Sequence, residues 1–452
     1  MMVLTIAVPM MIQNGISNFV NLLDNLMIGR IGTNALSGVA IANQLMFVYF
    51  LLMFGATAGV GIFTAQYFGM GDTDGIRYTF RVKIVLNFIL TLAAMAVLFI
   101  FAEPLIGLFL KGEGNPEDAA QTLEIGVDYM RIMVVGLIPL PFAYSYSGTL
   151  KDIGQTRVPM FASLTAIVVN LVGNILLIYG YFGLPALGAR GAAIATVISR
   201  FVELTFLAIY TGTHSEAHPF IKGAFKSFKV PGNLVGKFIV KSLPLMLNET
   251  LWAAGMTTMN QCFSYRSLDA VAALNIESTI WNLLGVAFLT MGEAVGIIIG
   301  QTLGSGDIDK AKTDAKKLTA FTVALGVMFG IVMVGIAGLF PMLYNTTAAV
   351  RAMATKFIMV YGALMPVFAY THASYFIIRA GGRTGITFLF DSCFVWIVSV
   401  PVAFYLSRYT RMNVVSMLII VEALELIKCV IGGIMVNAGI WAKNIVSEGN
   451  SL

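Results

Sequence analysis

The chain has 452 residues, of which 58% are hydrophobic and only 11% are charged, and its mean hydropathy is +0.85. Such a chain has too little polar surface to cover a water-soluble globule, so its composition indicates a membrane protein. The net charge of +5 comes from Lys and Arg residues dispersed over short loops, without the basic, aromatic-interleaved face of a nucleic-acid-binding protein. Cys262, Cys393 and Cys429 lie in apolar segments without metal-ligand spacing and are expected to be inert.

Apolar runs long enough to cross a bilayer follow one another along the chain. About 20 residues cover roughly 30 Å of hydrocarbon, and about twelve such runs can be separated by charged breaks. Their cores are residues 3–28, 35–67, 84–110, 124–150, 157–180, 188–211, 236–263, 269–302, 317–343, 351–378, 384–407 and 412–440. We therefore predict an all-α polytopic membrane protein, in which the long second and eighth runs tilt or project from the bilayer.

The distribution of basic residues predicts the orientation of these helices. With the N-terminus in the cytoplasm, most Lys and Arg residues fall in the inner loops and their flanks. The positive-inside rule therefore places both termini in the cytoplasm of a multi-pass protein of the cell (plasma or inner) membrane. Residues 1–8 carry no basic region, so we expect the first helix to be retained rather than cleaved as a signal peptide.

An internal repeat is the strongest organisational feature. Residues 65–74, AQYFGMGDTD, return as residues 300–309, GQTLGSGDID, and the same offset pairs Pro9 with Pro244. A second block, residues 142–144, returns as residues 368–370. The chain thus reads as two pseudo-symmetric six-helix lobes, which enter the membrane in the same direction because six is even.

We predict four parts from this repeat: an N-lobe over residues 1–211, a cytoplasmic basic linker over 212–235, a C-lobe over 236–440 and a cytoplasmic tail over 441–452. In the linker, Ile221, Phe225 and Phe228 follow one helical stripe, and three lysines follow the next. This pattern predicts a short interfacial helix on the anionic inner leaflet, ending at Pro231.

Asp24 is the first candidate for coupling chemistry. A charge at mid-bilayer costs about 2.5 to 3.5 kcal/mol on insertion scales, and Asp24 has no basic residue at three or four positions on either side. Pro9, earlier in the same run, removes a backbone hydrogen bond and is expected to bend the helix, as is Pro244 in the repeat. A carboxylate in a wet, apolar-lined cavity can take and release a proton as the cavity opens to either side.

Two amides can assist Asp24. Asn170 and Asn174 are four residues apart and share one face of a helix. Their oxygens can accept from a protonated carboxyl or ligate a small cation. The alternative is that they only bond two helices together.

The second lobe carries its own set of intramembrane acids. Glu249 and Glu293 look deep enough to line a cavity, whereas Glu277 and Asp391 are expected near helix ends and solvated. His372 either relays protons or is simply hydrogen-bonded in the bundle.

Other charged residues are expected to stabilise the structure rather than to take part in transport. Arg200 with Glu203, and Glu425 with Lys428, are three residues apart and can neutralise each other on one helix, while Glu422 is left open. Glycines recur every fourth residue at 292, 296, 300 and 304, which predicts close helix packing or hinge motion rather than ligand binding. There is no Walker loop, paired-histidine zinc motif or GxSxG elbow, so we expect no enzyme and no cofactor, but transport driven by an ion gradient.

Three passages together resemble the multidrug and toxic compound extrusion (MATE) family. They are Asn21-Leu-Leu-Asp24-Asn-Leu-Met-Ile-Gly29-Arg-Ile-Gly32, the Gly-x-Gly-Asp loops ending at Asp72 and Asp307, and Arg379-Ala-Gly-Gly-Arg-Thr384. The match covers nearly the whole chain. It implies a V-shaped pair of six-helix lobes that export organic, cationic or amphipathic compounds in exchange for H⁺ or Na⁺ by alternating access.

The resemblance also implies roles for particular residues. Asp24 matches the acidic residue of the N-lobe ion site and Asn170 the asparagine beside it, whereas Asn174 departs from relatives that carry a second acid there. Glu249 matches an acid of a C-lobe sodium site whose partner acid is missing here. If Na⁺ is the coupling ion, Asp24 or Glu249 would hold it; the single titratable Asp24 favours H⁺.

Proteins of other functions share parts of this pattern. A lipid-linked saccharide flippase of the same superfamily is the alternative, and it would show extra helices and a basic cavity. A receptor or channel requires neither two parallel halves nor an unpaired carboxylate. The expected partners are small organic substrates and membrane lipids, with no nucleic acid, and the expected state is a monomer.

Overall fold

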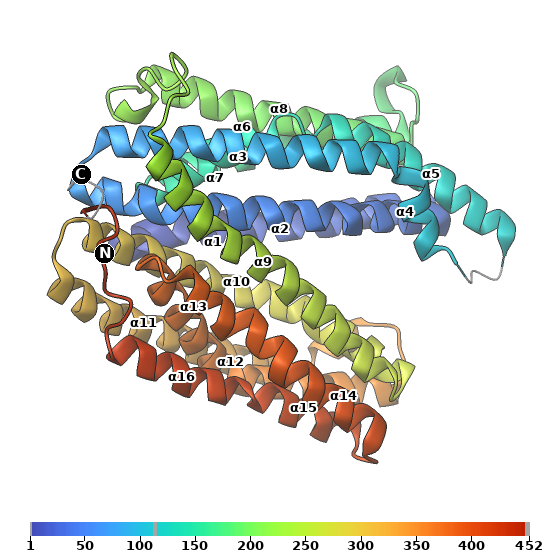
Figure 1. Cartoon of the computed structure of the whole chain (residues 1–452). Helices are drawn as coiled ribbons and strands as arrows, with labels where there is room; N and C mark the ends of the chain where they lie inside the picture. The colour runs from blue at the N-terminus through green and yellow to red at the C-terminus, as the bar shows by residue number, and fades with distance from the viewer. Residues whose placement is uncertain (1, 112–114, 448–452) are drawn as a thin grey trace. The chain divides into compact units, whose positions relative to one another are not determined.

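The computed structural model describes residues 2–111 and 115–447. In this part of the chain all regular elements are helices (Figure 1). The first half contains α1 (Met2–Gly29), α2 (Thr33–Met70), α3 (Thr73–Ile100), α4 (Ala102–Phe109), α5 (Pro116–Val135), α6 (Leu140–Asp152), α7 (Arg157–Tyr179) and α8 (Ala189–Thr213). The second contains α9 (Gly232–Ser264), α10 (Leu268–Gly304), α11 (Ile308–Ile336), α12 (Ala348–Ala380), α13 (Thr384–Phe388), α14 (Val400–Tyr409), α15 (Val414–Ala423) and α16 (Glu425–Asn437).

Each apolar run of the sequence coincides with one helix or with consecutive short helices. Within the described residues, 9 helices are long and apolar enough to cross a membrane, and the pair α5 and α6, bent by 59°, makes 10. The two remaining runs are α9, where polar residues such as Asn248 and Glu249 lower the hydropathy, and the pair α15 and α16, which are shorter than one span each. The all-α membrane fold is confirmed.

The chain divides into two compact units. One, called here the N-terminal unit, comprises Ile12–Thr64 and Thr73–Ile239; the other, the C-terminal unit, comprises Met1–Met11, Ala65–Asp72 and Val240–Leu452. The chain therefore passes from one unit to the other within continuous helices, close to Pro9 in α1 and to Pro244 in α9. Because proline removes one backbone hydrogen bond, these crossings support the predicted bends, which remain predictions.

Apolar residues at helical spacing form the core of each unit. In the N-terminal unit, Met46, Met53, Ile106 and Met130 are fully buried where α2, α4 and α5 pack. In the C-terminal unit, Phe288, Phe357 and Met417 play the same part between α10, α12 and α15. Many large apolar side chains are exposed, as expected for helices that face lipid rather than water.

The glycine stripe of α10 is confirmed as a packing surface. An added Cβ at Gly292 or Gly296 would meet Phe376 of α12 within 3.1 Å. At Gly304 it would lie 1.9 Å from the carbonyl oxygen of Gln66, and at Gly69 it would lie 1.9 Å from that of Gln301. The repeated Gln-x-x-Gly segments of α2 and α10 therefore pack on each other in a reciprocal way.

The linker differs from its prediction, because it is not an interfacial helix. Only Pro219–Ile221 form a 3₁₀ turn; the rest of residues 214–231 run through turns and extended chain. Arg81 of α3 donates to the carbonyls of Gly223 (2.8 Å), Ala224 (2.9 Å) and Lys229 (3.1 Å). These carbonyls bond to the guanidinium rather than to a helical backbone, and Gly223 adopts a positive φ of 76°.

Aromatic contacts hold the same linker against α3 and α8. Phe220 is buried with its ring centroid 5.4 Å from that of Phe80. His218 is also buried, tilted against Tyr210 and Phe220. Burial, and secondarily the nearby His214, lowers the pKa of His218 below its usual value of 6.5.

We predict that acid loosens this linker. A lowered pKa means that the folded state binds fewer protons than the unfolded state, so the stabilisation is complete above about pH 6.5 and is lost as the pH falls through the folded-state pKa. Hydrogen exchange of residues 214–231, corrected for intrinsic rates, should rise between pH 7.5 and 5. In His218→Phe this rise should largely disappear; an equal rise in both proteins contradicts the prediction.

The reciprocal glycine contact generates a second prediction. Gly304→Ala places a Cβ against the backbone of α2, which cannot rotate away, so the free energy of unfolding should fall by about 1–3 kcal/mol. Gly335→Ala in α11 is the matched control, because an added Cβ there meets nothing within 4 Å. Thermal unfolding of the purified full chain measures both. Equal midpoints for the two variants would mean that the close approach is not stabilising.

Candidate functional site

A polar cluster in the N-terminal unit joins three helices at Asp24. The Nδ2 of Asn174 in α7 donates to Asp24 Oδ1 of α1 over 2.6 Å and to Asn170 Oδ1 over 3.2 Å. Asn170 in turn donates to the hydroxyl of Thr196 in α8 over 3.1 Å. The structure thus brings together all three residues that the sequence suggested for this site.

The electrostatics of this cluster leave room for a cation or a proton. Asp24 has no ion-pair partner within 4.0 Å among the described residues. Asn174 is 1% exposed, and its Oδ1 is buried without a hydrogen-bond partner in the described part of the chain. A buried oxygen with no donor is costly, so a protonated Asp24 or a small hard cation fits this position.

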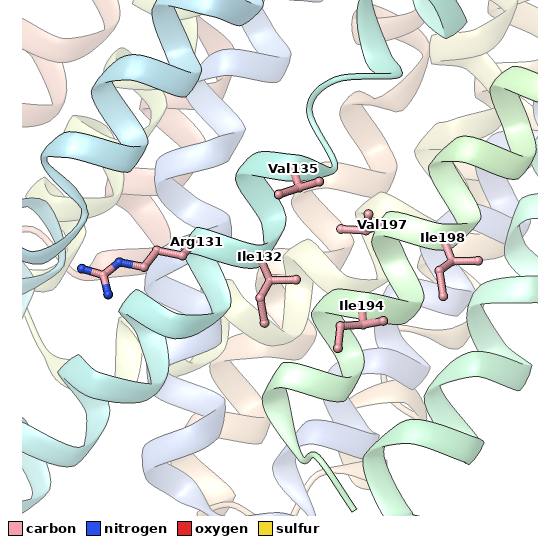
Figure 2. Close-up of a pocket in the computed structure, with 6 residues that line it drawn as sticks. All are labelled: Arg131, Ile132, Val135, Ile194, Val197 and Ile198. Atoms are coloured by element: carbon pink, nitrogen blue, oxygen red, sulfur yellow. The ribbon is translucent and has the colours of Figure 1, made fainter. Parts of the chain in front are cut away.

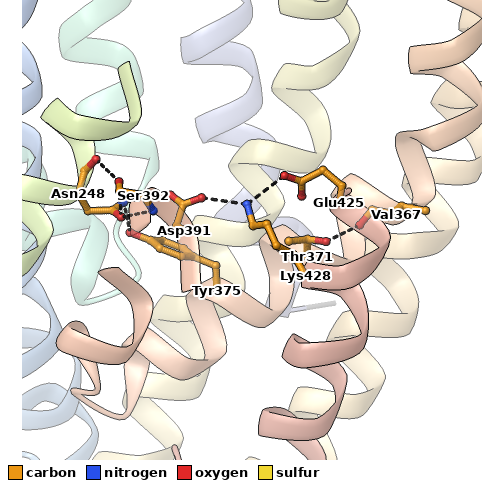
Figure 3. A network of polar contacts seen from close by, with 8 residues as sticks. All are labelled: Asn248, Val367, Thr371, Tyr375, Asp391, Ser392, Glu425 and Lys428. Carbon is orange, nitrogen blue, oxygen red and sulfur yellow. Dashed lines mark hydrogen bonds and ion pairs between the residues drawn. The ribbon is translucent and has the colours of Figure 1, made fainter. Parts of the chain in front are cut away.

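The C-terminal unit contains a denser cluster around Asp391 (Figure 3). Lys428 Nζ lies 3.0 Å from Asp391 Oδ1 and 3.1 Å from Glu425 Oε1. Asn248 Nδ2 donates to the other oxygen of Asp391 over 3.0 Å and contacts the hydroxyl of Tyr375. The expected pairing of Glu425 with Lys428 is confirmed, but Asp391, expected near a helix end and solvated, is instead held by Lys428 and Asn248.

The backbone around Asp391 is unusual. Leu389–Cys393 and Val395–Ser399 are π-helical turns between α13 and α14. The Ser392 amide donates to Asn248 Oδ1 over 3.2 Å, so the side chain of Asn248 in α9 serves as acceptor for one backbone amide of the π-turns. The Ser392 hydroxyl donates to the backbone carbonyl of Asn248 over 2.7 Å. The only sequence signal for Asn248 was its place beside Glu249.

The remaining C-lobe candidates lie around this cluster. Glu249 is half-buried and interacts electrostatically with Arg379, Asp391 and Glu293. His372 is surrounded by rings, 5.1 Å from Phe376 and 6.3 Å from both Tyr375 and Phe288. A proton relay through His372 remains a prediction.

Two charged residues differ from their expected environments. Glu277 was expected to be solvated near a helix end but is 4% exposed, and Glu422 in α15 is its electrostatic neighbour. Arg200 has no ion pair with Glu203 among the described contacts; it donates to the Gly136 carbonyl over 3.2 Å and lies over the ring of Phe50. The reason is that tertiary contacts outweigh spacing along one helix.

A groove on the N-terminal unit is separate from these clusters (Figure 2). It has a volume of about 320 Å³ between α5 and α8 and is lined by Arg131, Ile132, Val135, Ile194, Val197 and Ile198. Figure 2 shows the guanidinium of Arg131 extending away from the five apolar side chains. None of the residues suggested by the sequence lines this groove.

Comparison with known proteins identifies the family. The MatE family model matches residues 9–176 and 244–405, two segments that begin at the paired prolines Pro9 and Pro244. The chain belongs to the MatE family. This family consists of membrane transporters, so the prediction that the chain is not an enzyme is confirmed.

Two relatives of this MatE protein have low sequence identity to it, but their alignments cover most of both chains. The chain is 23% identical over 415 residues to the probable multidrug resistance protein YoeA of Bacillus subtilis, covering 90% of this chain and 87% of YoeA. It is 22% identical over 446 residues to the probable multidrug resistance protein NorM of Thermotoga maritima, covering 98% and 93%. These values describe similarity across both halves.

Solved structures show the same fold. The chain matches a variant of the Vibrio cholerae MATE transporter VcmN with a TM-score of 0.86 at 17% identity, covering 98% of this chain and 97% of that one. It matches an outward-facing multidrug resistance MATE transporter with a TM-score of 0.81 at 18% identity, covering 97% and 96%. At these identities the likeness concerns the fold alone.

The Asp391 cluster generates a prediction about stability in this MatE protein. Lys428→Met leaves two partly buried carboxylates without their shared cation, so the free energy of unfolding should fall by about 3–5 kcal/mol. Adding Asp391→Asn removes one stranded charge and should restore part of the loss. Thermal unfolding measures each protein, with exposed Lys356→Met as the control. If the single and double variants are equally unstable, the ion pair is not what holds the cluster.

Proposed function

We propose that the chain is a secondary active antiporter that exports organic, cationic or amphipathic compounds in exchange for protons, with Asp24 as the coupling residue. The observation that carries this proposal is the environment of Asp24. Its carboxylate accepts a 2.6 Å hydrogen bond from Asn174 and has no ion pair with a basic residue among the described residues. The names of the relatives, probable multidrug resistance proteins, support export of small compounds.

The proposed coupling uses the chemistry of this cluster. Deprotonated Asp24 accepts a hydrogen bond from Asn174, whose own oxygen receives none from the residues that the structure describes. Once protonated, Asp24 can instead donate to that oxygen if the amide turns over, so both protonation states find a partner. A proton bound from the outside and released to the cytoplasm would drive the opposite movement of substrate.

The same proposal includes the membrane location, the topology and the oligomeric state of the transporter. We propose a multi-pass protein of the bacterial plasma membrane with both termini in the cytoplasm, supported by the bias of Lys and Arg toward the inner loops. No cofactor is needed, membrane lipids are its neighbours, and a monomer suffices because both halves are on one chain. The division into lobes at residues 1–211 and 236–440, with a cytoplasmic linker and tail, is part of this proposal.

The coupling role of Asp24 is tested by its neutral isostere. Asp24→Asn removes the exchangeable proton with little change in shape, so efflux of a fluorescent organic cation from proteoliposomes should fall at least about 10-fold under a proton gradient. The exposed acid Glu117, replaced by Gln, is the control in the same half and should export normally.

Separate gradients identify the ion. Wild-type efflux driven by a pH step alone supports protons, whereas efflux driven only by a sodium step moves the assignment to Na⁺ held by oxygens of Asp24 and Asn174. A folded Asp24→Asn variant that exports at the wild-type rate would contradict the proposed coupling role of Asp24. No efflux under either gradient overturns the export of this class of compound.

A further inference from the structure

The groove between α5 and α8 has no part in the proposed transport. Five of its six lining residues are aliphatic, and Val135 and Ile198 remain 49% and 46% exposed on its open side. Its volume of about 320 Å³ is at the small end of the range of ligand sites, which is about 300–1,000 Å³. The groove therefore suits a narrow apolar chain better than a compound of several rings.

The groove begins where the polar part of α5 ends. Four acidic residues precede Arg131 on this helix, whereas residues 132–150 carry no charged side chain. This uncharged stretch is close to the length of about 20 residues that crosses the hydrocarbon of a bilayer. Arg131 therefore lies where the polar surface meets the hydrocarbon, and the groove residues Ile132 and Val135 lie on the hydrocarbon side of it.

An ion pair joins the two helices on the polar side of the groove. Arg190 Nε of α8 donates to Asp128 Oδ2 of α5 over 3.0 Å. Ile132 follows Asp128 by four residues and Ile194 follows Arg190 by four, so each lies one turn further along the same helix face. Ile198, at the other end, is eight residues from Arg190. At 1.5 Å per residue the groove thus extends from about 6 Å to about 12 Å beyond the ion pair.

Arg131 supplies a positive charge that the described protein does not neutralise. It is exposed and has no ion pair within 4.0 Å among the described residues. Arg131 and Val135 are four residues apart and share one face of α5, and Figure 2 shows the guanidinium directed away from the apolar side chains. A cationic compound is repelled at this position, whereas a phosphate is attracted and can accept two hydrogen bonds from the guanidinium.

The end of α5 keeps the groove open. After Val135 the chain bends by 59° into α6. Gly136, at this bend, has no side chain, and an added Cβ there would lie only 2.9 Å from Val197 Cγ2 of α8. Because α5 ends here, no further turn of it covers Val197 and Ile198, and the aliphatic side chains remain accessible from the membrane.

We propose that this groove holds one acyl chain of an anionic phospholipid whose phosphate is bound by Arg131. Such a lipid places a negative headgroup beside an apolar chain, which matches the exposed guanidinium and the aliphatic groove next to it in order and in charge. A zwitterionic lipid offers the same chains and a phosphate, but its own positive group offsets the attraction to Arg131. The proposal concerns binding alone and does not depend on the proposed antiport.

Native mass spectrometry of the purified full chain tests the site. The protein is freed of lipid in detergent and titrated with phosphatidylglycerol or phosphatidylcholine. The first phosphatidylglycerol should bind about 5-fold more tightly than the first phosphatidylcholine, the factor that one basic residue contributes at a membrane surface. Arg131→Gln should remove this preference, and Val135→Trp, which fills the groove, should weaken the binding of both lipids. Lys356→Gln and Ile209→Trp, exposed outside the groove, should keep the wild-type affinities.

Several results would overturn the proposal. They are the absence of saturable binding of a first lipid, an unchanged preference for phosphatidylglycerol in Arg131→Gln, and equal weakening by Val135→Trp and Ile209→Trp. A lipid-free wild-type dimer that Val135→Trp dissociates would assign the groove to a second copy of the chain instead. Thermal unfolding checks that each variant is folded, and Ile198→Trp on the same open side replaces Val135→Trp if that variant is not. Failure of export under either gradient leaves these outcomes unchanged, so the two proposals fail independently.

Discussion

The cost of an uncompensated charge inside hydrocarbon is the constraint on which the interior of this protein depends. Each intramembrane carboxylate must find a basic partner, a hydrogen-bond donor or a bound cation, because the surrounding side chains and lipid offer none of water's solvation. The two units satisfy this constraint differently. The N-terminal unit gives Asp24 a single amide donor, whereas the C-terminal unit gives Asp391 a lysine and an asparagine.

This difference makes the two halves chemically unequal despite their repeated fold. Lys428 acts as a fixed counter-ion, so the carboxylate of Asp391 is already neutralised by the protein itself. Asp24 has no such counter-ion within 4.0 Å among the described residues. The repeated scaffold therefore holds Asp391 beside a fixed cation, whereas Asp24 has an amide donor instead.

Whether a feature could be predicted from the sequence depends on how far apart along the chain its interacting residues lie. Lengths of apolar runs located α2 and α10, and four-residue spacing placed Asn170 beside Asn174, because these depend only on helical geometry. The linker was misread because its stripe of Phe225 and Phe228 is equally compatible with a turn held by Arg81, which lies far away in the chain. The partners of Asp391 and Glu277 come from other helices, and a single sequence does not reveal such pairings.

The reciprocal packing of α2 on α10 carries a consequence for the origin of the fold. Gly69 meets the carbonyl of Gln301, and its repeat equivalent Gly304 meets that of Gln66. Contacts in which each residue touches the equivalent of its partner are the mark of an isologous interface between identical subunits. An ancestor with six helices would have made this same contact as a homodimer, with the end of the second helix of each copy packed on that of the other. Fusion of the two genes would then have kept this contact inside one chain, where Ala65–Asp72 of the first half group with the C-terminal unit.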